Sequence, residues 1–228
     1  MPARSYTIRA NIWIRKGDYE RAMSDLNEAF RLDPGYPSAF SNRGYIEMKQ
    51  GEYGRAMADF NEAVRLNPKD AFALHNRCAI WEVKGDDDHA IADYTAAIQA
   101  NPKFARAHFD RGSIRMKQGD YERAIADFDE VIRVGSRPLA GNAYYLRGLV
   151  FEKREDYERA IADFSKVIQL APQFAEAYSH RADCWSLKGQ PERAAADYKQ
   201  ASKLAPPRGK ATQRKPSSES GLTTSTPQ

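Results

Sequence analysis

Prolines return along this chain at an interval of 34 residues, and this interval constrains the fold more than any other feature. They stand at Pro34, Pro68, Pro102, Pro172 and Pro206. The third interval is 70 residues, so two extra residues lie within it, and we place them in the segment 134–141. Glycines keep the same period at Gly17, Gly51, Gly85, Gly119 and Gly189. An internal period of this length indicates an array of repeats.

The period divides residues 3–206 into six tandem units. They cover 3–36, 37–70, 71–104, 105–140, 141–174 and 175–208. In each unit a first apolar-periodic run ends at the glycine, or at Glu155 in the fifth unit, where a left-handed residue can terminate a helix. The next residue is usually an Asp that can cap a second helix, and the proline ends that helix. The sequence therefore predicts twelve helices, with a single irregular connection between units at 134–141.

Small residues recur where two helices of a unit would approach each other. One column, in the first helices, reads Ala10, Gly44, Cys78, Gly112, Gly148, Ala182, and another, in the second helices, reads Ala22, Ala56, Ala90, Ala124, Ala160, Ala194. A large column in the second helices reads Leu26, Phe60, Tyr94, Phe128, Phe164, Tyr198. This pattern is typical of an antiparallel helix pair, which must stack on its neighbours to bury its apolar faces.

These features resemble the tetratricopeptide repeat family, in an array of bacterial type. The stretch from Ala39 to Tyr53 follows the family pattern nearly throughout, and the resemblance covers roughly nine-tenths of the chain in six copies. It implies an all-α fold, a right-handed superhelical solenoid of antiparallel helix pairs, with a concave groove lined by the first helices. It also implies a non-catalytic scaffold that binds a partner protein or peptide in that groove.

Two unbroken charged columns depart from the family pattern. Where an apolar residue is usual, the chain has Arg9, Arg43, Arg77, Arg111, Arg147 and Arg181. The second helices carry Asp25, Asp59, Asp93, Asp127, Asp163 and Asp197. We predict a structural ladder in which each Asp accepts from a first-helix Arg, with help from an Arg four residues earlier on the Asp's own helix. The alternative is two solvated charged stripes.

Positive charge gathers in the C-terminal tail, residues 207–228. The tail is rich in Ser, Thr and Pro and carries +3 of the chain's net charge of +4, and we expect it to be disordered. Residues 1–206 carry only +1, with both signs interspersed, unlike the basic face of a dedicated nucleic-acid binder. A nucleic-acid-associated protein that uses the basic tail is therefore the second hypothesis, behind protein binding.

No catalytic signature accompanies the repeats. The chain has no phosphate loop, nucleophile elbow or dinucleotide-binding glycine pattern, so we expect no enzyme activity and no cofactor. The acidic run Asp86–His89 fits a helix N-terminus better than a metal site. Cys78 and Cys184 have no metal-ligand spacing and are predicted to be small buried residues. We therefore predict no metal site.

The sequence also bears on location and on the ends of the array. No stretch is apolar enough to span a membrane, and the N-terminus lacks a secretory signal, which predicts a cytoplasmic protein. A secreted or periplasmic protein is the alternative if N-terminal sequence is missing. Ile8 and Ile12 lie on a face that no preceding unit covers. That face is either a homodimer contact or a sign that the chain has lost N-terminal residues.

Helical spacing places one set of first-helix side chains on the face away from the second helix, where the resemblance puts the groove. They are Tyr45, Lys49, Phe72, His75, Asn76, Arg106, Phe109, Lys117, Asn142, Tyr145 and Lys153. Aromatic rings beside basic groups suit an extended segment with apolar side chains and an acidic group. The alternative is that these rings pack sideways on neighbouring first helices.

The family's chaperone-tail binders hold a terminal carboxylate with basic residues and asparagines. Asn11 and Asn42 match that clamp, but Thr7 stands where a basic residue is expected. A chaperone-tail ligand is therefore in doubt.

Overall fold

The computed structural model describes residues 1–204, which form twelve α-helices and no strand. The helices are α1 (Ala3–Lys16), α2 (Tyr19–Leu32), α3 (Pro37–Lys49), α4 (Tyr53–Leu66), α5 (Ala71–Lys84), α6 (Asp87–Ala100), α7 (Ala105–Lys117), α8 (Tyr121–Val134), α9 (Arg137–Lys153), α10 (Tyr157–Leu170), α11 (Ala175–Leu187) and α12 (Pro191–Leu204). The predicted all-α class is confirmed. The tail 207–228 lies outside the described residues.

The turns within the pairs follow from short local signals. Four of the second helices begin after an aspartate whose side chain accepts from a backbone N–H three residues on, as Asp18 does from Arg21 at 3.1 Å. The residue that ends the first helix is usually a glycine with positive φ, such as Gly119 at 80°. In the fifth unit Glu155 takes this conformation with φ 60°, and it is the one non-glycine residue among 1–204 that does so.

The two helices of a pair meet where small residues face large ones. A Cβ added to Gly148 would lie 2.8 Å from Cε1 of Phe164, and one added to Gly112 would lie 3.0 Å from Phe128. Phe164 and Phe128 are themselves fully buried. Helix α9 can therefore approach α10 this closely only because a glycine stands opposite the ring.

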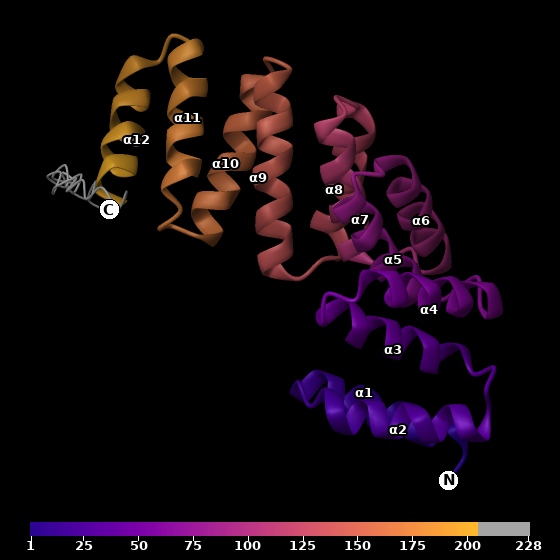
Figure 1. Ribbon diagram of the computed structural model, residues 1–228. Coiled ribbons are helices and arrows are strands. Elements are labelled where there is room, and N and C mark those ends of the chain that lie inside the picture. The colour runs from indigo at the N-terminus through magenta and orange to yellow at the C-terminus, as the bar shows by residue number, and fades with distance from the viewer. Residues whose placement is uncertain (205–228) are drawn as a thin grey trace, which may run out of the picture.

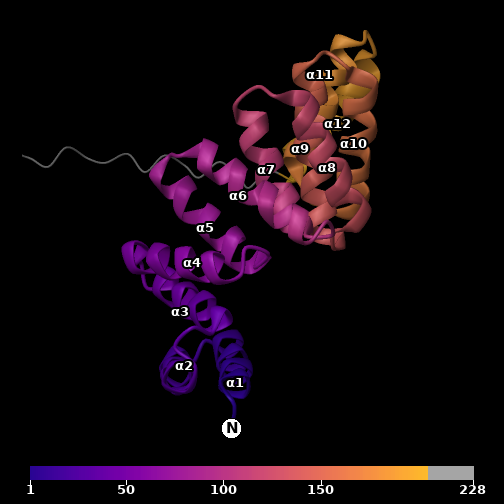
Figure 2. The ribbon, with the colours of Figure 1, turned by 90° about the vertical axis from the view of Figure 1, so that its right-hand side faces the viewer.

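The pairs stack one after another into a curved array (Figure 1). The axes of α1–α4 lie across those of α9–α12 in both views, so the array twists along its length (Figures 1 and 2). Odd-numbered helices contact one another across units, namely α1 with α3, α3 with α5, α7 with α9, and α9 with α11. We call the surface formed by the odd-numbered helices the first-helix face. None of the helices within residues 1–204 has the length and apolar character to cross a membrane.

The connection between α8 and α9 differs from the prediction. The segment 134–141 was expected to be an irregular loop, but α9 begins at Arg137, so most of the segment is helical. Pro138 lies in the first turn of α9, where a missing backbone N–H costs no intrahelical hydrogen bond. The inserted residues lengthen α9, which at 17 residues is the longest of the twelve described helices.

Candidate functional site

Each arginine of the predicted ladder donates two parallel hydrogen bonds to the aspartate on the second helix of its own unit. In the third unit Arg77 donates from Nε and from Nη2 to the two carboxylate oxygens of Asp93, both at 2.6 Å. The same fork joins Arg9 to Asp25, Arg43 to Asp59, Arg111 to Asp127, Arg147 to Asp163 and Arg181 to Asp197. All six aspartates are buried. Two charges buried together stabilise a fold only with good geometry, and this bidentate fork supplies it.

In four of the six pairs the third guanidinium nitrogen of the arginine contacts the preceding unit. Arg111 Nη1 donates to Thr95 Oγ1 on α6 at 2.9 Å, and Arg181 Nη1 donates to Ser165 on α10 at the same distance. Arg77 contacts Asn61 and Arg147 contacts Asp129 in the same way. These acceptors were not predicted from the sequence. They form a column at the 34-residue period, but its residue type changes from unit to unit.

The local arginines contact other partners than predicted. Arg55, Arg123 and Arg159 were expected to help bind the ladder aspartate four residues later, but each pairs with the acidic residue three positions before it. That acid precedes the second helix, and three residues along a helix bring the two side chains to one face. These outer pairs are exposed, so they contribute little to stability.

Asp127 has the densest set of partners in the ladder. Besides Arg111 it accepts from Arg115 at 2.7 Å, and it contacts the buried ring of His108 at 3.2 Å. Burial alone would raise the pKa of Asp127, but the hydrogen bonds from His108 and Arg111 outweigh burial and hold that pKa below its usual value. A carboxylate that keeps its charge inside the array is a structural partner of the cations around it.

Unit two places an acid where units three and four place a hydrogen-bond donor. In unit three Trp81 Nε1 donates to Asp93 at 3.2 Å, and Arg115 occupies the same position in unit four. The equivalent residue is Glu47, whose Oε2 is buried and has no hydrogen-bond partner among the described residues. Burial, with the nearby charge of Asp59, raises the pKa of Glu47 to about 7.

The predicted groove residues fall into two groups by exposure. Phe72, Lys49, Arg106, Lys117, Asn142 and Lys153 are exposed. Tyr45, Phe109 and Tyr145 are half-buried because their rings meet other rings: Tyr45 lies 5.7 Å from Phe72, and Tyr145 meets Phe174 edge-on at 5.0 Å between centroids. Part of each aromatic surface therefore packs sideways, and part stays open.

Two predicted groove residues are largely occupied by contacts within the array. Asn76 is buried, and its amide donates to the carbonyl of Phe72 on the same helix at 2.7 Å. His75 contacts Asp110 at 3.1 Å and packs 5.0 Å from the ring of Phe104. Both positions were predicted to be open from helical spacing alone, which does not show how near the next unit comes.

Three predicted residues line one cavity of about 520 Å³. Phe109 comes from α7, and Asn142 and Tyr145 come from α9. Its other lining residues are Arg137, Pro138, Gly141, Leu146, Val167, Leu170, Ala171 and Phe174. We call it the α7–α9 cavity. It is mainly apolar, with one cation and one amide, a composition common among ligand sites. Arg137, at the start of α9, and Phe174, just before α11, were not predicted as site residues from the sequence.

Two other predicted groove residues, Lys153 and Phe72, line separate cavities. Lys153 lines a second cavity of about 510 Å³ with Glu152 and His180. Phe72 lines a third, of about 280 Å³, beside Thr7, Asn42 and the carboxylate of Asp70. An acid here disfavours a terminal carboxylate as ligand, in agreement with the incomplete clamp inferred from the sequence.

The profile of the tetratricopeptide repeat matches residues 9–71, 84–133, 110–175 and 145–209. None of the curated protein sequences compared matches the chain.

Several solved structures resemble the array. The structure of MamA has a TM-score of 0.68 at 20% identity, over 74% of this chain and 91% of MamA. YrrB, described as a TPR protein with an unusual peptide-binding site, has a TM-score of 0.71 at 17% identity, over 78% and 91%. PilF of Pseudomonas aeruginosa has a TM-score of 0.73 at 17% identity, over 89% and 91%. At these identities the likeness concerns the fold.

Proposed function

The chain belongs to the tetratricopeptide repeat family, and from that premise we propose that it is a non-catalytic scaffold that binds an extended segment of a partner protein on its first-helix face. The observation that carries the proposal is the α7–α9 cavity, in which Phe109, Asn142 and Tyr145 meet although they come from two units. YrrB, a structural relative, is described as having a peptide-binding site, which agrees with this class of function.

The α7–α9 cavity has the size and chemistry for an apolar side chain. A volume of about 520 Å³ accepts a Leu or Phe side chain with room for the adjoining backbone. Burying such a side chain contributes about 1.5–3 kcal/mol. Phe109, Leu170 and Phe174 supply the apolar walls, and the half-buried ring of Tyr145 meets Phe174 edge-on.

The polar groups of the cavity define what lies beside that side chain. The exposed amide of Asn142 can both donate to and accept from the backbone of an extended peptide. Arg137 has no ion-pair partner within residues 1–204, whereas Arg106 already donates to Asp110 at 2.8 Å. Arg137 is therefore the cation we assign to an acidic residue next to the apolar anchor.

A cavity-filling variant tests the proposal with little risk to the fold. A Cβ added to Gly141 would meet only Leu170 Cδ1, at 3.6 Å, which is ordinary contact. Gly141→Leu therefore fills the α7–α9 cavity while raising helix propensity. The matched control is Gly54→Leu on α4, where an added Cβ meets nothing within 4 Å.

The probe is a set of labelled seven-residue acidic peptides with a central Leu or Phe, measured by fluorescence anisotropy. We expect wild-type protein and Gly54→Leu to bind them equally, and Gly141→Leu to bind at least about tenfold more weakly with an unchanged or higher melting temperature. Arg137→Ala should lower the affinity for the acidic peptides and leave the affinity for neutral versions unchanged. Equal affinity of wild type and Gly141→Leu would remove the cavity from the binding site.

A homodimer through the N-terminal unit is a separate part of the proposal. Ile8 and Ile12 on α1 are 54% and 49% exposed, so the pair leaves about half of its apolar surface open. Sedimentation of Ile12→Glu beside wild type tests it, and a wild-type monomer at high concentration would refute it.

A further inference from the structure

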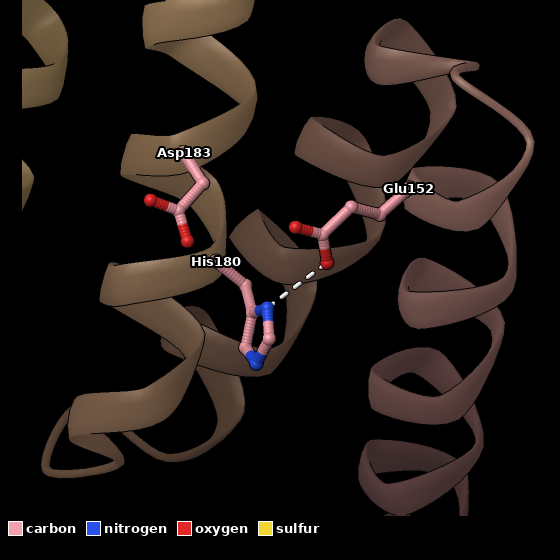
Figure 3. A group of neighbouring side chains, drawn as sticks. All are labelled: Glu152, His180 and Asp183. Carbon is pink, nitrogen blue, oxygen red and sulfur yellow. Dashed lines mark hydrogen bonds and ion pairs between the residues drawn. The ribbon is translucent and has the colours of Figure 1, made fainter.

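Three metal-ligating side chains converge between the last two units, outside the α7–α9 cavity. Glu152 points from α9 toward His180 and Asp183 of α11 (Figure 3). One ligand atom of each residue lies within 4.8 Å of the other two, and His180 Nδ1 lies 2.9 Å from Glu152 Oε2. We propose that Glu152, His180 and Asp183 bind a divalent transition-metal ion of the Zn²⁺ class.

Helix geometry explains why these residues share one place. His180 and Asp183 are three residues apart on α11, so their side chains project from one face of the helix. Glu152 lies near the end of α9, which contacts α11 directly. The three ligands therefore come from the first helices of consecutive units, and an ion held by them would join the two units.

The donor set matches this class of ion. One imidazole nitrogen and two carboxylates suit Zn²⁺ and its first-row neighbours, whereas Mg²⁺ and Ca²⁺ prefer oxygen donors alone. The two formal negative charges balance a divalent cation. Zn²⁺ bonds of about 2.1 Å place ligand atoms about 3.4 Å apart in a tetrahedral site, so small side-chain rotations would close the present arrangement.

The surroundings hold the ligands in place and leave a coordination position open. Asp183 accepts a hydrogen bond from the hydroxyl of Tyr198 on α12. Ligands of metal ions in proteins commonly have a hydrogen-bond partner of this kind, which orients them. The ring of His180 stacks on Phe164, with centroids 5.5 Å apart and planes at 23°. Glu152 and His180 line the second cavity of about 510 Å³, which has room for a water molecule as fourth ligand.

Competing cations do not neutralise the two carboxylates. Lys188, which directly follows α11, is paired with Glu158 on α10. Neither Glu152 nor Asp183 forms an ion pair with a Lys or Arg among residues 1–204. The charged-group contact that Glu152 makes there is with His180. The six buried aspartates of the ladder each have an arginine partner, whereas Glu152 and Asp183 are half-buried and have none within residues 1–204.

The test is titration of the chelator-treated full chain with ZnCl₂ by isothermal calorimetry. We expect one ion per chain, a melting temperature that rises with ZnCl₂ and returns with EDTA, and no effect of MgCl₂. CoCl₂ should give the visible absorption of a bound ion of low coordination number. His180→Ala should weaken Zn²⁺ binding at least about tenfold, since loss of outer partners alone costs that much.

Matched variants separate this site from surface binding. Glu152→Gln and Asp183→Asn keep side-chain shape, so they report on ligation even if His180→Ala lowers stability. His89→Ala removes an exposed histidine that pairs with Asp86 and should leave the Zn²⁺ affinity unchanged. Zn²⁺ affinity that survives Glu152→Gln and Asp183→Asn, or that is lost in His89→Ala, would overturn the proposal, as would wild-type protein that binds no Zn²⁺.

Discussion

Arg111 of α7 donates through Nη1 to Thr95 Oγ1 of α6 at 2.9 Å, across the boundary between two units. The same guanidinium holds Asp127 of α8 through its other two nitrogens. One side chain therefore connects three helices of two units. The stability of a solenoid is the sum of the stabilities of its units and of the interfaces between them, so these arginines stabilise both the unit and the interface.

The contact across the boundary can be measured by a double-mutant cycle. Thr95→Val removes the hydroxyl and keeps the shape, and Arg111→Met removes the guanidinium. We expect a coupling free energy of about 1 kcal/mol between the two changes in urea unfolding. Thr95→Val combined with Arg43→Met is the control, because Arg43 pairs with Asp59 and makes no hydrogen bond to Thr95, so the two effects should simply add. Additive effects for the Thr95 and Arg111 pair would show that the contact carries no coupling.

Asp127→Ala should destabilise the array strongly. It leaves Arg111 and Arg115 without their shared carboxylate in a buried position, and breaking such a pair costs about 3–5 kcal/mol. Glu62→Ala is the control, since Glu62 also holds an arginine with two hydrogen bonds, to Arg65, but on an exposed helix surface. Equal decreases in melting temperature for the two variants would mean that burial of the ladder does not affect stability.

Glu155→Gly should stabilise the protein. Glu155 holds a left-handed conformation with φ 60°, which costs a side-chain-bearing residue about 1 kcal/mol. The reverse change, Gly119→Ala at φ 80°, should lower stability by a similar amount, although an added Cβ there meets nothing within 4 Å. Chemical denaturation of both variants checks the signs. Loss of stability in Glu155→Gly would mean that the Glu155 side chain makes contacts worth more than the backbone strain.

Stability should fall as pH rises through neutrality because of Glu47. Burial raises its folded-state pKa to about 7, above the ordinary value of 4.5. Between these values the folded state binds more protons than the unfolded state, so the stabilising contribution is full at low pH and lost as pH passes 7. Melting temperatures from pH 5 to pH 8 should decline less in Glu47→Gln than in wild type. Glu62→Gln should keep the wild-type slope, because Arg65 lowers the pKa of Glu62 and its titration lies below this range.

The parts of the structure that repeat identically were predictable from the chain. An Arg column and an Asp column at the same period on two helices of one unit indicated their pairing, and the small residues opposite Phe128 and Phe164 indicated how close the helices come. Features set by the approach of one unit to the next were not predictable. His75 has an open position on an isolated helix, but Asp110 of the next unit contacts it, and Asn76 is buried within the array.

The insertion before α9 shows the other limit. Gly135, Ser136 and Pro138 are residues typical of loops, yet Pro138 fits the first turn of a helix as well as it fits a loop. This local ambiguity concealed Arg137, and with it the cation of the α7–α9 cavity. The three ligands proposed for Zn²⁺ were overlooked because Glu152 is 28 residues from His180, and only stacking brings α9 beside α11.

The arginines that donate a hydrogen bond across a unit boundary follow the order in which the chain is synthesised. Each reaches back to a partner that precedes it in the chain: Arg77 to Asn61, Arg111 to Thr95, and Arg181 to Ser165. On the ribosome the acceptor has therefore emerged before the arginine that needs it, and each new unit docks onto a finished surface. Truncation should be asymmetric for the same reason. Among the arginine contacts, removing α11 and α12 leaves the hydroxyl of Ser165 with its bond to the Ile161 carbonyl, whereas removing α1 and α2 takes away the ring of Phe30, on which Arg43 rests at 4.4 Å.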